Sequence, residues 1–334
     1  MKGRRQAGAV RLGRDGVQLY EQSGYGRPRG DGLELSPVEA LYLVHRGRLE
    51  LPGETFESML ADFTKDPGFL RRYLVYRDLR ERGYVVQMGP HDFRVFRRGQ
   101  RPGSGQSQYM VRVLSERDPV SFGRLITEAT STAHMRKSHL LAVVDDEDEL
   151  TYYQIKLPVL SSLGKVVPER PVPVHRYGWI VIADGENGLV LEAAGYGTRL
   201  DIQRLKLAPV EAVHLFASGF LVPENGEDGA TSMDVSEVSR IDAEADEKAA
   251  VYSYLRDRGY VPRTGYKFGH HYRVYAAGKI HSEMLVHALS DGASLPMSVI
   301  SRSVRLAHSV KKKMLFGCKC SEGIFFVEFA RIKL

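Results

Sequence analysis

The sequence has few residues that could hold a protein together through disulfides or metal ions. Only 2 of its 334 residues are cysteine. Cys318 and Cys320 lie two positions apart on an expected strand, where they make a poor disulfide pair. No CxxC pair is present, so the case for a zinc site is weak. These absences indicate a reducing, cytoplasmic setting, and neither a metal nor a cofactor is expected.

Long apolar runs and nucleotide-binding loops are also missing. No apolar run approaches the roughly 18 residues that span a bilayer, and the basic N-terminal residues are not followed by an apolar stretch typical of a secretory signal. We find no GxxxxGK[ST], HExxH or EF-hand pattern. No contact with a membrane is therefore expected. The 47 basic residues against 41 acidic ones give a net charge of +6, which weakly favours an anionic partner such as nucleic acid.

The most informative feature of the sequence is an internal repeat, in which the second half resembles the first. Gly83-Tyr84 matches Gly259-Tyr260, Arg94-Val95 matches Arg273-Val274, and Ala133-His134 matches Ala307-His308. A Gly-Tyr-Gly turn followed by Pro-Val-Glu-Ala also occurs in both halves, with the prolines at Pro37 and Pro209. The sequence therefore predicts two copies of one structural unit.

The pattern of expected elements predicts an α/β (α+β) fold made of tandem duplicated units. Each unit has a small N-terminal α/β subdomain and a nuclease-type subdomain with a small mixed β-sheet flanked by helices. Four prolines between Pro158 and Pro173 indicate a stiff linker. The expected divisions are 1–68 and 69–157 for copy one, 158–176 for the linker, and 177–244 and 245–334 for copy two.

Three expected elements of these units are specific enough to check against the structure. The apolar run from Gly188 to Glu192 is typical of a strand. Long helices are expected from Pro119 to Ser138 and from Pro296 to Lys313, each followed by a hairpin. Within the second helix, Ile300, Val304 and Ala307, with Met314 after it, should face the core.

The two copies differ at three positions that matter chemically. Phe96, Gln106 and Ser138 of copy one are matched with Tyr275, His281 and Lys312 of copy two. At each position the second copy holds the group that can move a proton or carry charge. A duplicated fold in which one copy carries these reactive groups suggests that one copy forms an enzyme site and the other is a structural partner.

The second copy also carries a polar helix face. Arg305, His308, Ser309 and Lys312 stand at i, i+3, i+4 and i+7, so they would share one side of the expected helix. No acidic residue on this face balances the two fixed cations. The alternative interpretation is a solvated basic face, which the Lys311 to Lys313 run alone would favour.

A tyrosine, a histidine and a lysine without a carboxylate cluster point to metal-free cleavage of RNA. Tyr275 could take the proton from a ribose 2′-OH, His281 could protonate the leaving 5′-oxygen, and Lys312 could stabilise the charge of the pentacovalent state. The products would be a 2′,3′-cyclic phosphate and a 5′-OH, and DNA would be inert. Structural readings remain open, since an edge-strand tyrosine and a surface histidine are both common.

These residues resemble the archaeal tRNA-splicing endonucleases. The resemblance rests on blocks in the same order: Tyr252 to Tyr260, Lys267 to Tyr275, His281-Ser282 with the strand after it, and Arg305 to Lys313. It covers most of the chain, because copy one echoes most of these blocks, and it implies that the catalytic tyrosine, histidine and lysine are Tyr275, His281 and Lys312. The implied activity is cleavage of precursor tRNA at both intron borders in a bulge–helix–bulge.

The resemblance also implies an assembly and contacts with RNA. A double-length chain with one degenerate copy resembles the homodimeric form of the family, in which an acidic loop docks on the opposite chain. The matching loop here is Asp145, Asp146, Glu147, Asp148 and Glu149. The family also holds a bulged base between two arginines, which would be Arg305 and Arg331, with His308 nearby on the expected helix face.

The sequence also allows two alternative functions, a non-catalytic subunit and a metal-dependent nuclease. The chain could be a non-catalytic RNA-binding or structural subunit of a splicing endonuclease assembly, but in that case at least one of Tyr275, His281 and Lys312 should have been replaced. A metal-dependent nuclease would need carboxylates close to a lysine on neighbouring strands, and the repeated blocks contain none.

Overall fold

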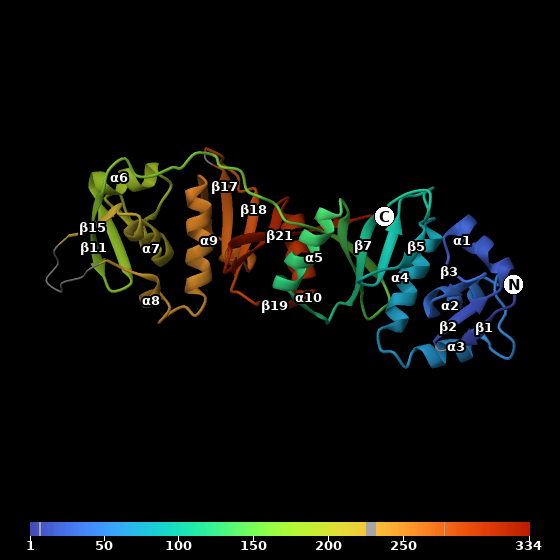
Figure 1. Cartoon of the computed structure of the whole chain (residues 1–334). Helices are drawn as coiled ribbons and strands as arrows, with labels where there is room; N and C mark the ends of the chain where they lie inside the picture. The colour runs from blue at the N-terminus through green and yellow to red at the C-terminus, as the bar shows by residue number, and fades with distance from the viewer. Residues whose placement is uncertain (7, 225–231, 277) are drawn as a thin grey trace.

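A computed structural model describes residues 1–6, 8–224, 232–276 and 278–334 of the chain. The molecule is elongated, with a small subdomain at each end and a large sheet between them (Figure 1). Both copies have the order expected from the sequence, a small α/β unit followed by a nuclease-type unit, and the α+β fold class with two tandem units is confirmed.

Copy one begins with its N-terminal subdomain. The elements are β1 (Arg4–Gln6), β2 (Ala9–Leu12), η1 (Arg14–Gly16), α1 (Val17–Ser23), β3 (Arg27–Arg29), β4 (Gly32–Leu35), α2 (Pro37–His45) and α3 (Phe56–Phe63). The nuclease-type unit follows with α4 (Phe69–Glu81), β5 (Val86–Met88), β6 (Phe93–Phe96), β7 (Ser107–Ser115), β8 (Pro119–Ser121), α5 (Phe122–His134), β9 (Ser138–Val144) and β10 (Leu150–Lys156).

Copy two repeats this order. Its N-terminal subdomain has β11 (Val172–Tyr177), β12 (Ile180–Asp184), α6 (Gly185–Ala193), β13 (Thr198–Arg199), β14 (Arg204–Leu207), α7 (Pro209–Ala217), β15 (Leu221–Pro223) and α8 (Val235–Val238). The nuclease-type unit has α9 (Ala245–Asp257), β16 (Tyr260–Thr264), η2 (Tyr266–Phe268), β17 (Tyr272–Ala276), β18 (Met284–Leu289), β19 (Ser294–Pro296), α10 (Met297–Ser309), β20 (Lys313–Cys320) and β21 (Gly323–Ile332). The first of these strands, β11, starts inside the segment expected to be a linker.

The two nuclease-type units share one ten-stranded sheet, in the order β16-β17-β18-β20-β21-β10-β9-β7-β6-β5. The join is the antiparallel pair of β10 and β21, in which Tyr153 lies opposite Arg331. Within each unit one neighbouring pair is parallel, β7 with β9 and β18 with β20. The order is the same when read outward from the join in either direction, so the units are related by an approximate two-fold axis.

An aromatic core under this join ties the copies together. Residues of helices α5 and α10 belong to one core cluster on the sheet, and strands β8 and β19 pair with each other (Figure 1). The rings of Phe122, Phe316 and Phe329 lie with centroids 5.2 to 6.2 Å apart, and all three are fully buried. Because copy one supplies one ring and copy two supplies the others, neither half has a complete core alone.

A buried glutamate explains why the Gly-Tyr-Gly turn and the Pro-Val-Glu-Ala motif occur together. The Glu39 carboxylate accepts hydrogen bonds from the amides of Gly26 and Ser36 at 2.8 and 2.9 Å. Glu211 does the same in copy two, with the Gly197 amide at 3.2 Å. Burial raises the pKa of both carboxyl groups. The glutamate thus holds the turn against the first turn of the following helix.

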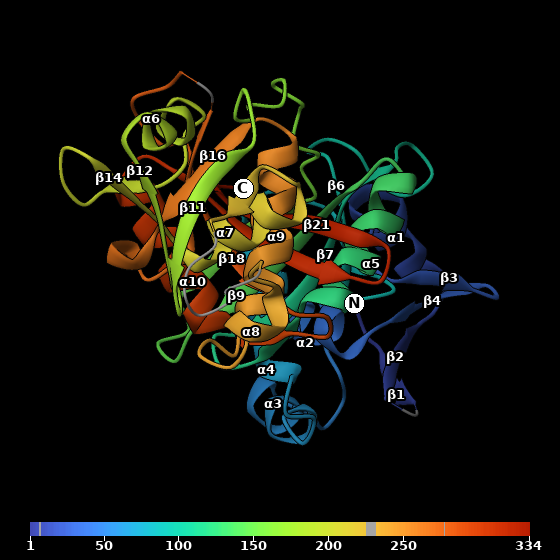
Figure 2. The same cartoon turned by 90° about the vertical axis from the view of Figure 1, so that its left-hand side faces the viewer.

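An arginine stacked on a tyrosine fixes each N-terminal subdomain to the next helix. Arg80 of α4 lies 3.7 Å from the ring centroid of Tyr25, and Arg256 of α9 lies 3.7 Å from that of Tyr196. Each guanidinium also donates to a backbone carbonyl of its subdomain, at Ser23 and Ala194. Seen from the copy-two end, α7 and α9 lie in front of the sheet (Figure 2).

The segment from Gly188 to Glu192 is helical, so the strand expected there is wrong. It belongs to α6, in which Gly188 and Leu191 are buried, whereas Leu189 is 54% exposed. Buried positions three residues apart fit a helix lying on the sheet, and a strand would have alternated. The helices expected to begin at Pro119 and Pro296 begin later, at Phe122 and Met297, because β8 and β19 come first.

Three histidines form a buried cluster behind the candidate site of copy two. The rings of His271 and His287 stack with centroids 4.2 Å apart, and His270 meets His287 edge-on at 5.6 Å. Burial lowers the pKa of His270 and His271 to about 4 and also lowers the pKa of His287. Glu244 lies 3.3 Å from His271 Nε2 and opposes the shift there.

This cluster predicts that the protein loses stability in acid. The unfolded histidines take up protons near pH 6.5, whereas folded His270 and His271 remain neutral until about pH 4. The free energy of unfolding should therefore fall as the pH drops from about 6.5 to about 4. Urea titrations at several pH values measure this fall, and His270→Leu should reduce its slope by up to about one proton, or roughly 1.4 kcal/mol per pH unit. An unchanged slope would contradict the assignment.

Candidate active site

The register of the sheet brings the three candidate residues of copy two to one end of it. Val274 pairs with Met284 on β18, so Tyr275 near the end of β17 lies close to the connection to β18, which contains His281. Met284 in turn pairs with Lys313 at the start of β20, which places Lys312 level with the residue before Met284. Residues that the sequence separates by up to 37 positions thus lie at the same end of neighbouring strands.

Each of these side chains has a different environment. Tyr275 is half-buried, with the guanidinium of Arg273 5.8 Å from its ring centroid. His281 is exposed just before β18. Lys312 is half-buried, and its Nζ donates a hydrogen bond to the carbonyl of Ser282 at 2.7 Å. That bond holds the ammonium beside the residue that follows His281.

Lys312 is positioned by the turn that ends α10, not by the helix itself. The helix ends at Ser309, and Lys311 adopts the left-handed conformation with a φ of 55°. The amide of Lys312 donates to the Ala307 carbonyl at 2.8 Å, and the amide of Lys311 donates to that of His308 at 3.0 Å. This pair of bonds is a Schellman motif. The helix expected to reach Lys313 is therefore too long.

The common helix face predicted for four polar residues is consequently wrong. Arg305 and His308 lie exposed on α10, opposite the buried Ile300, Val304 and Ala307, as expected. Lys312 lies beyond the helix, where the turn redirects its side chain toward the strand after His281. Met314 is also buried, but it belongs to β20.

The same turn in copy one corrects the comparison of the two copies. Helix α5 ends at His134, Arg136 has a φ of 55°, and the amide of Lys137 donates to the Thr132 carbonyl at 3.0 Å. The residue equivalent to Lys312 is therefore Lys137. The sequence comparison paired Lys312 with Ser138, and that pairing is wrong.

The sheet register gives the same correspondence. Ser138 begins β9 and pairs with Tyr109, just as Lys313 begins β20 and pairs with Met284. Matching the Ala-His dipeptides of the two helices shifts the correspondence between the copies by one residue. Copy one thus retains the lysine and departs from copy two at Phe96 and Gln106.

Arg331, the second arginine predicted to contact RNA, lies near the strand ends that carry the candidate site. Arg331 is exposed on β21, near the C-terminus. Leu315 of β20 pairs with Glu328 of β21, and continuing that register by three residues places Arg331 level with Lys312. Arg305 is exposed on α10, so the two arginines come from different elements.

The acidic residues of copy one form the turn between β9 and β10. Asp145 Oδ1 accepts from the amides of Glu147 and Glu149 at 3.0 and 2.9 Å, and Asp148 has a φ of 62°. Asp146 forms an ion pair with Arg117. The turn is thus built by Asp145, while the side chains of the other four residues are exposed.

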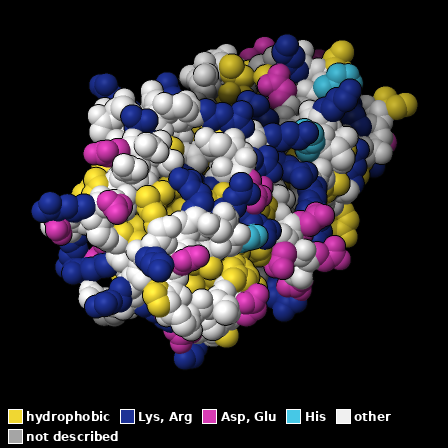
Figure 3. All heavy atoms as spheres, turned by 90° about the vertical axis from the view of Figure 1, so that its right-hand side faces the viewer, with side chains coloured by type: hydrophobic (Ala, Val, Ile, Leu, Met, Phe, Trp, Pro, Cys, Tyr) yellow, Lys and Arg dark blue, Asp and Glu magenta, His cyan; other side chains and the backbone are white. Residues whose placement is uncertain are grey.

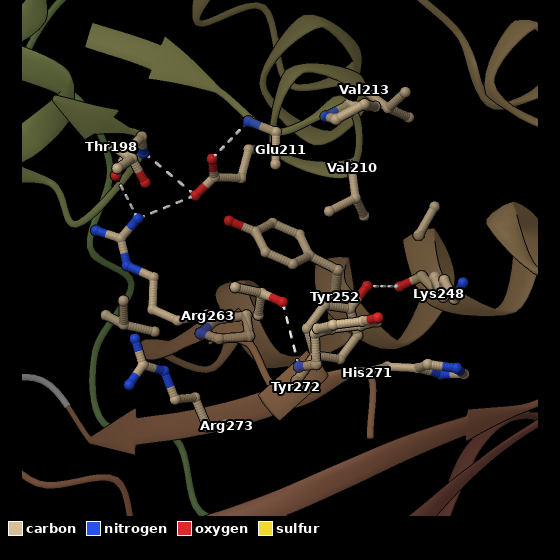
Figure 4. Close-up of a pocket in the computed structure, with 18 of the residues that line it drawn as sticks. Thr198, Val210, Glu211, Val213, Lys248, Tyr252, Arg263, His271, Tyr272 and Arg273 are labelled. Carbon is tan, nitrogen blue, oxygen red and sulfur yellow. Dashed lines mark hydrogen bonds and ion pairs between the residues drawn. The ribbon is translucent and has the colours of Figure 1, made fainter. Parts of the chain in front are cut away.

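A groove of about 800 Å³ lies between the two subdomains of copy two, and Tyr275 is part of its lining. The groove is bounded by α7, α9, β16 and β17 (Figure 4). Arg263 in its wall pairs with Glu211 at 3.3 Å and so is neutralised. Arg273 and Lys279 have no carboxylate partner in the described part of the chain, which leaves the groove basic near Tyr275. Sequence reasoning missed Arg273 because copy one has Arg94 at the same position.

One group of side chains with metal-ligating atoms occurs among the described residues, and it lies in copy one. The ligand atoms of His91, Glu128 and His139 are all within 4.8 Å of one another. The Glu128 carboxylate already binds the guanidinium groups of Arg112 and Arg124, at 3.0 and 2.8 Å from their Nε atoms. These two cations neutralise the carboxylate, so the cluster acts as an ion-pair network between α5 and the sheet.

No helix in the described ranges is long and apolar enough to cross a membrane. The two cysteines are free, with Cys318 buried in β20.

Comparison with known proteins identifies the family. The sequence matches the model of the tRNA intron endonuclease catalytic C-terminal domain at residues 69–152 and 245–323, and that of the tRNA intron endonuclease N-terminal domain at residues 1–60 and 178–235. It is 40% identical to a tRNA-splicing endonuclease of Methanosarcina acetivorans, with all of both chains covered, and 38% identical to one of Methanococcoides burtonii over 95% of each. Both domains of the family are thus present twice, and the chain belongs to the tRNA intron endonuclease family.

Proposed function

We propose that the chain cleaves precursor tRNA at both intron borders, within a bulge–helix–bulge, by attack of a ribose 2′-OH. The observation that carries this proposal is the sheet register that gathers Tyr275, His281 and Lys312 at one edge of copy two. The three side chains supply a base, an acid and a cation, which are the groups that this reaction needs.

The reaction conserves atoms and charge without any other reactant. The Tyr275 phenolate takes the proton of the 2′-OH, and the 2′-oxygen forms a bond to the adjacent phosphorus. The bond from phosphorus to the 5′-oxygen of the next nucleotide breaks, and His281 gives its proton to that oxygen. The products are a 2′,3′-cyclic phosphate and a 5′-OH, and DNA is inert because it lacks the 2′-OH.

The position of Lys312 suits it to stabilise charge on the phosphate. Among the residues that the structure describes, its Nζ has one hydrogen-bond acceptor, the Ser282 carbonyl, whereas an ammonium group has three donors. The other two N–H groups remain available for the non-bridging oxygens of the pentacovalent state. The carbonyl also fixes the ammonium before substrate arrives, so little reorganisation is needed.

Arg305 and Arg331 are proposed to hold a base that is flipped out of the RNA. Guanidinium planes stack on bases, and these two residues are exposed on α10 and β21. Neither forms an ion pair with a carboxylate of the described residues. His308, exposed one turn after Arg305, would contact the RNA next to this base.

We propose that two chains form a dimer in which the acidic turn of each docks in the basic groove of the other. Within one chain the turn is six strands away from β16, or roughly 30 Å at the usual strand spacing. The turn therefore cannot reach its own groove, but a second copy related by a two-fold axis could supply it. The exposed carboxylates complement Arg273 and Lys279.

Removal of charge from the turn should weaken the dimer. We expect Glu147→Gln/Asp148→Asn/Glu149→Gln to raise the dimer dissociation constant roughly tenfold or more at low salt, with a smaller effect at high salt. Sedimentation at several protein concentrations measures the constant. Glu186→Gln/Asp291→Asn/Glu322→Gln removes three other exposed carboxylates and should leave it unchanged. Equal effects of the two variants would refute the docking site.

Cleavage of an intron-containing precursor tRNA in EDTA, with analysis of the end groups, tests the proposed reaction. Cuts at both borders that leave cyclic phosphate and 5′-OH ends would support it. Binding without cleavage by the unaltered chain would favour the alternative, a non-catalytic RNA-binding or structural subunit of a splicing endonuclease assembly. Cleavage that requires added Mg²⁺ would contradict the assignment of the three residues. We place the reaction in the cytoplasm, where the two thiols would remain reduced.

A further inference from the structure

Copy one retains the architecture of the active site without its acid and base. The loop between β6 and β7 corresponds to the one that carries His281, and the turn after α5 presents Lys137 where copy two presents Lys312. Phe96, in the place of Tyr275, is 5% exposed and cannot exchange a proton. Gln106 stands where His281 does, and an amide does not titrate. This site cannot perform the proposed cleavage.

The same site is more basic than its catalytic counterpart. The exposed residues Arg97, Arg98 and Arg101 lie in the β6–β7 loop, and Arg136 and Lys137 form the neighbouring turn. None of the five has a carboxylate partner within the described ranges. The sequence contains no acidic residue from Phe93 to Ser115, whereas the equivalent stretch of copy two contains Glu283 and has only Lys279 in its loop. Cations were thus kept or gained where the catalytic groups were lost.

These cations converge because the sheet register places them together. Ser107 pairs with Phe96, so both ends of the loop lie at one edge of the sheet. Tyr109 pairs with Ser138, which puts Lys137 level with the start of β7 at the same edge. Figure 3 shows lysine and arginine side chains gathered on the copy-one end of the molecule. A surface of this kind attracts a polyanion.

One of these cations is also organised for contact with bases. The guanidinium of Arg98 lies 4.9 Å from the ring centroid of Tyr84, which is half-buried beside the loop. A guanidinium in contact with an aromatic ring forms a cation–π pair, and an unpaired base can stack on such a pair. A protein partner rich in carboxylates would not use this feature, so the combination favours RNA.

The topology places this surface and the active site toward opposite ends of the strands. Strands β9 and β20 run in opposite directions, because three successive antiparallel pairings separate them. Each site lies at the beginning of its strand. The register places Lys137 level with Phe316, four residues along β20 from Lys312. With three strand spacings between β9 and β20, these two lysines are about 20 Å apart. RNA would have to extend well beyond the cleaved bond to reach both.

We infer that this degenerate site of copy one, formed by Arg97, Arg98, Arg101, Arg136 and Lys137, binds the phosphate backbone of the RNA substrate without cutting it. The inference rests on the proposed function for the identity of the RNA. It makes the degenerate copy a binding element for parts of the substrate remote from the intron borders. Long substrates should therefore gain affinity that short ones do not.

The test compares two triple variants in a His281→Ala background, in which bound RNA stays intact. Arg97→Gln/Arg98→Gln/Arg101→Gln removes three charges from the site. Lys2→Gln/Lys206→Gln/Arg240→Gln removes three exposed charges elsewhere that have no carboxylate partner in the described part of the chain. Binding of a full-length precursor tRNA and of a short bulge–helix–bulge RNA is measured by titration at several salt concentrations. Thermal unfolding checks that both variants are folded.

The first variant should bind the full-length precursor roughly 10- to 50-fold more weakly, with a shallower salt dependence. Its affinity for the short RNA, and the rate at which the active chain with the same three changes cleaves it, should be within twofold of the parent. The second variant should behave like the parent with both RNAs. Equal losses in the two variants would overturn the inference, as would weaker dimerisation of the first variant with unchanged binding of RNA. Failure of the unaltered chain to cleave either RNA would instead refute the proposed function.

Discussion

The His281→Ala chain is expected to cleave precursor tRNA roughly 10²- to 10⁴-fold more slowly than the unaltered chain, the range typical for loss of a general acid or base. The leaving 5′-oxygen would depart without a proton, because the sequence between β17 and β18 contains no second histidine. Single-turnover cleavage of a precursor at saturating protein measures the chemical step directly.

Copy one supplies the matched control for this change. Gln106→Ala alters the equivalent position and should leave the rate constant unchanged. The affinity of His281→Ala for the precursor should also stay close to that of the parent, because the imidazole is exposed and has no hydrogen bond or ion pair with the residues that the structure describes. A rate that falls equally in both variants would mean that both copies contribute to catalysis. A rate that falls in neither would remove His281 from the mechanism.

Lys312→Met is expected to lower the cleavage rate roughly 10²- to 10³-fold, as does removal of one group that stabilises transition-state charge. Methionine preserves much of the length and apolar volume of lysine but loses the ammonium and its bond to the Ser282 carbonyl. The loss should appear in the rate constant at saturation, since the charge is needed most in the pentacovalent state.

The corrected correspondence between the copies makes Lys137→Met the control for this experiment. Lys137 occupies the same turn with the same backbone bonds, so the two changes alter equivalent backbone positions. Lys137→Met should leave the rate constant unchanged, although it should weaken binding of the full-length precursor. Similar rate losses in the two variants would indicate that the methionine disturbs the turn rather than the chemistry. Rescue by Lys312→Arg would show that charge alone suffices.

The duplicated order of elements could be predicted because it depends on local patterns. Period-two strands, amphipathic helices and glycines at helix ends recur in both halves, and the structure has the same order. The strand expected at Gly188 to Glu192 failed because a short apolar run fits a strand and a buried helix equally well. The choice is made by packing, since Gly188 and Leu191 lie against the sheet.

The end of α10 could not be predicted from side-chain types. Nothing in a run of three lysines marks the residue that adopts a left-handed conformation, and Lys311 does so without being a glycine. The reversal is imposed by β20, which must start at Lys313 to pair with β18. The incorrect match of Lys312 with Ser138 has the same origin, because it depends on residue identity, whereas the true equivalence depends on backbone conformation.

The pairing of the two copies is likewise invisible in the sequence. The periodicity of β10 and β21 shows that each is a strand, but the choice of β10 as the partner of β21 depends on contacts between distant residues. The groove beside Tyr275 arises from two subdomains that the sequence describes separately. Candidate residues could therefore be chosen from the differences between the copies, whereas shared residues such as Arg273 were overlooked.

The continuous sheet has a consequence for how the two halves can change over evolutionary time. If copy one were deleted, residues Glu328 to Ile332 of β21, which pair with β10, would become an open edge with unpaired amides and carbonyls beside an exposed aromatic face. Such an edge promotes aggregation. Selection on solubility thus retains the strands and core rings of copy one even after its acid and base are gone. Its loops carry no such constraint, so they are free to acquire a new role while the frame beneath them cannot be discarded.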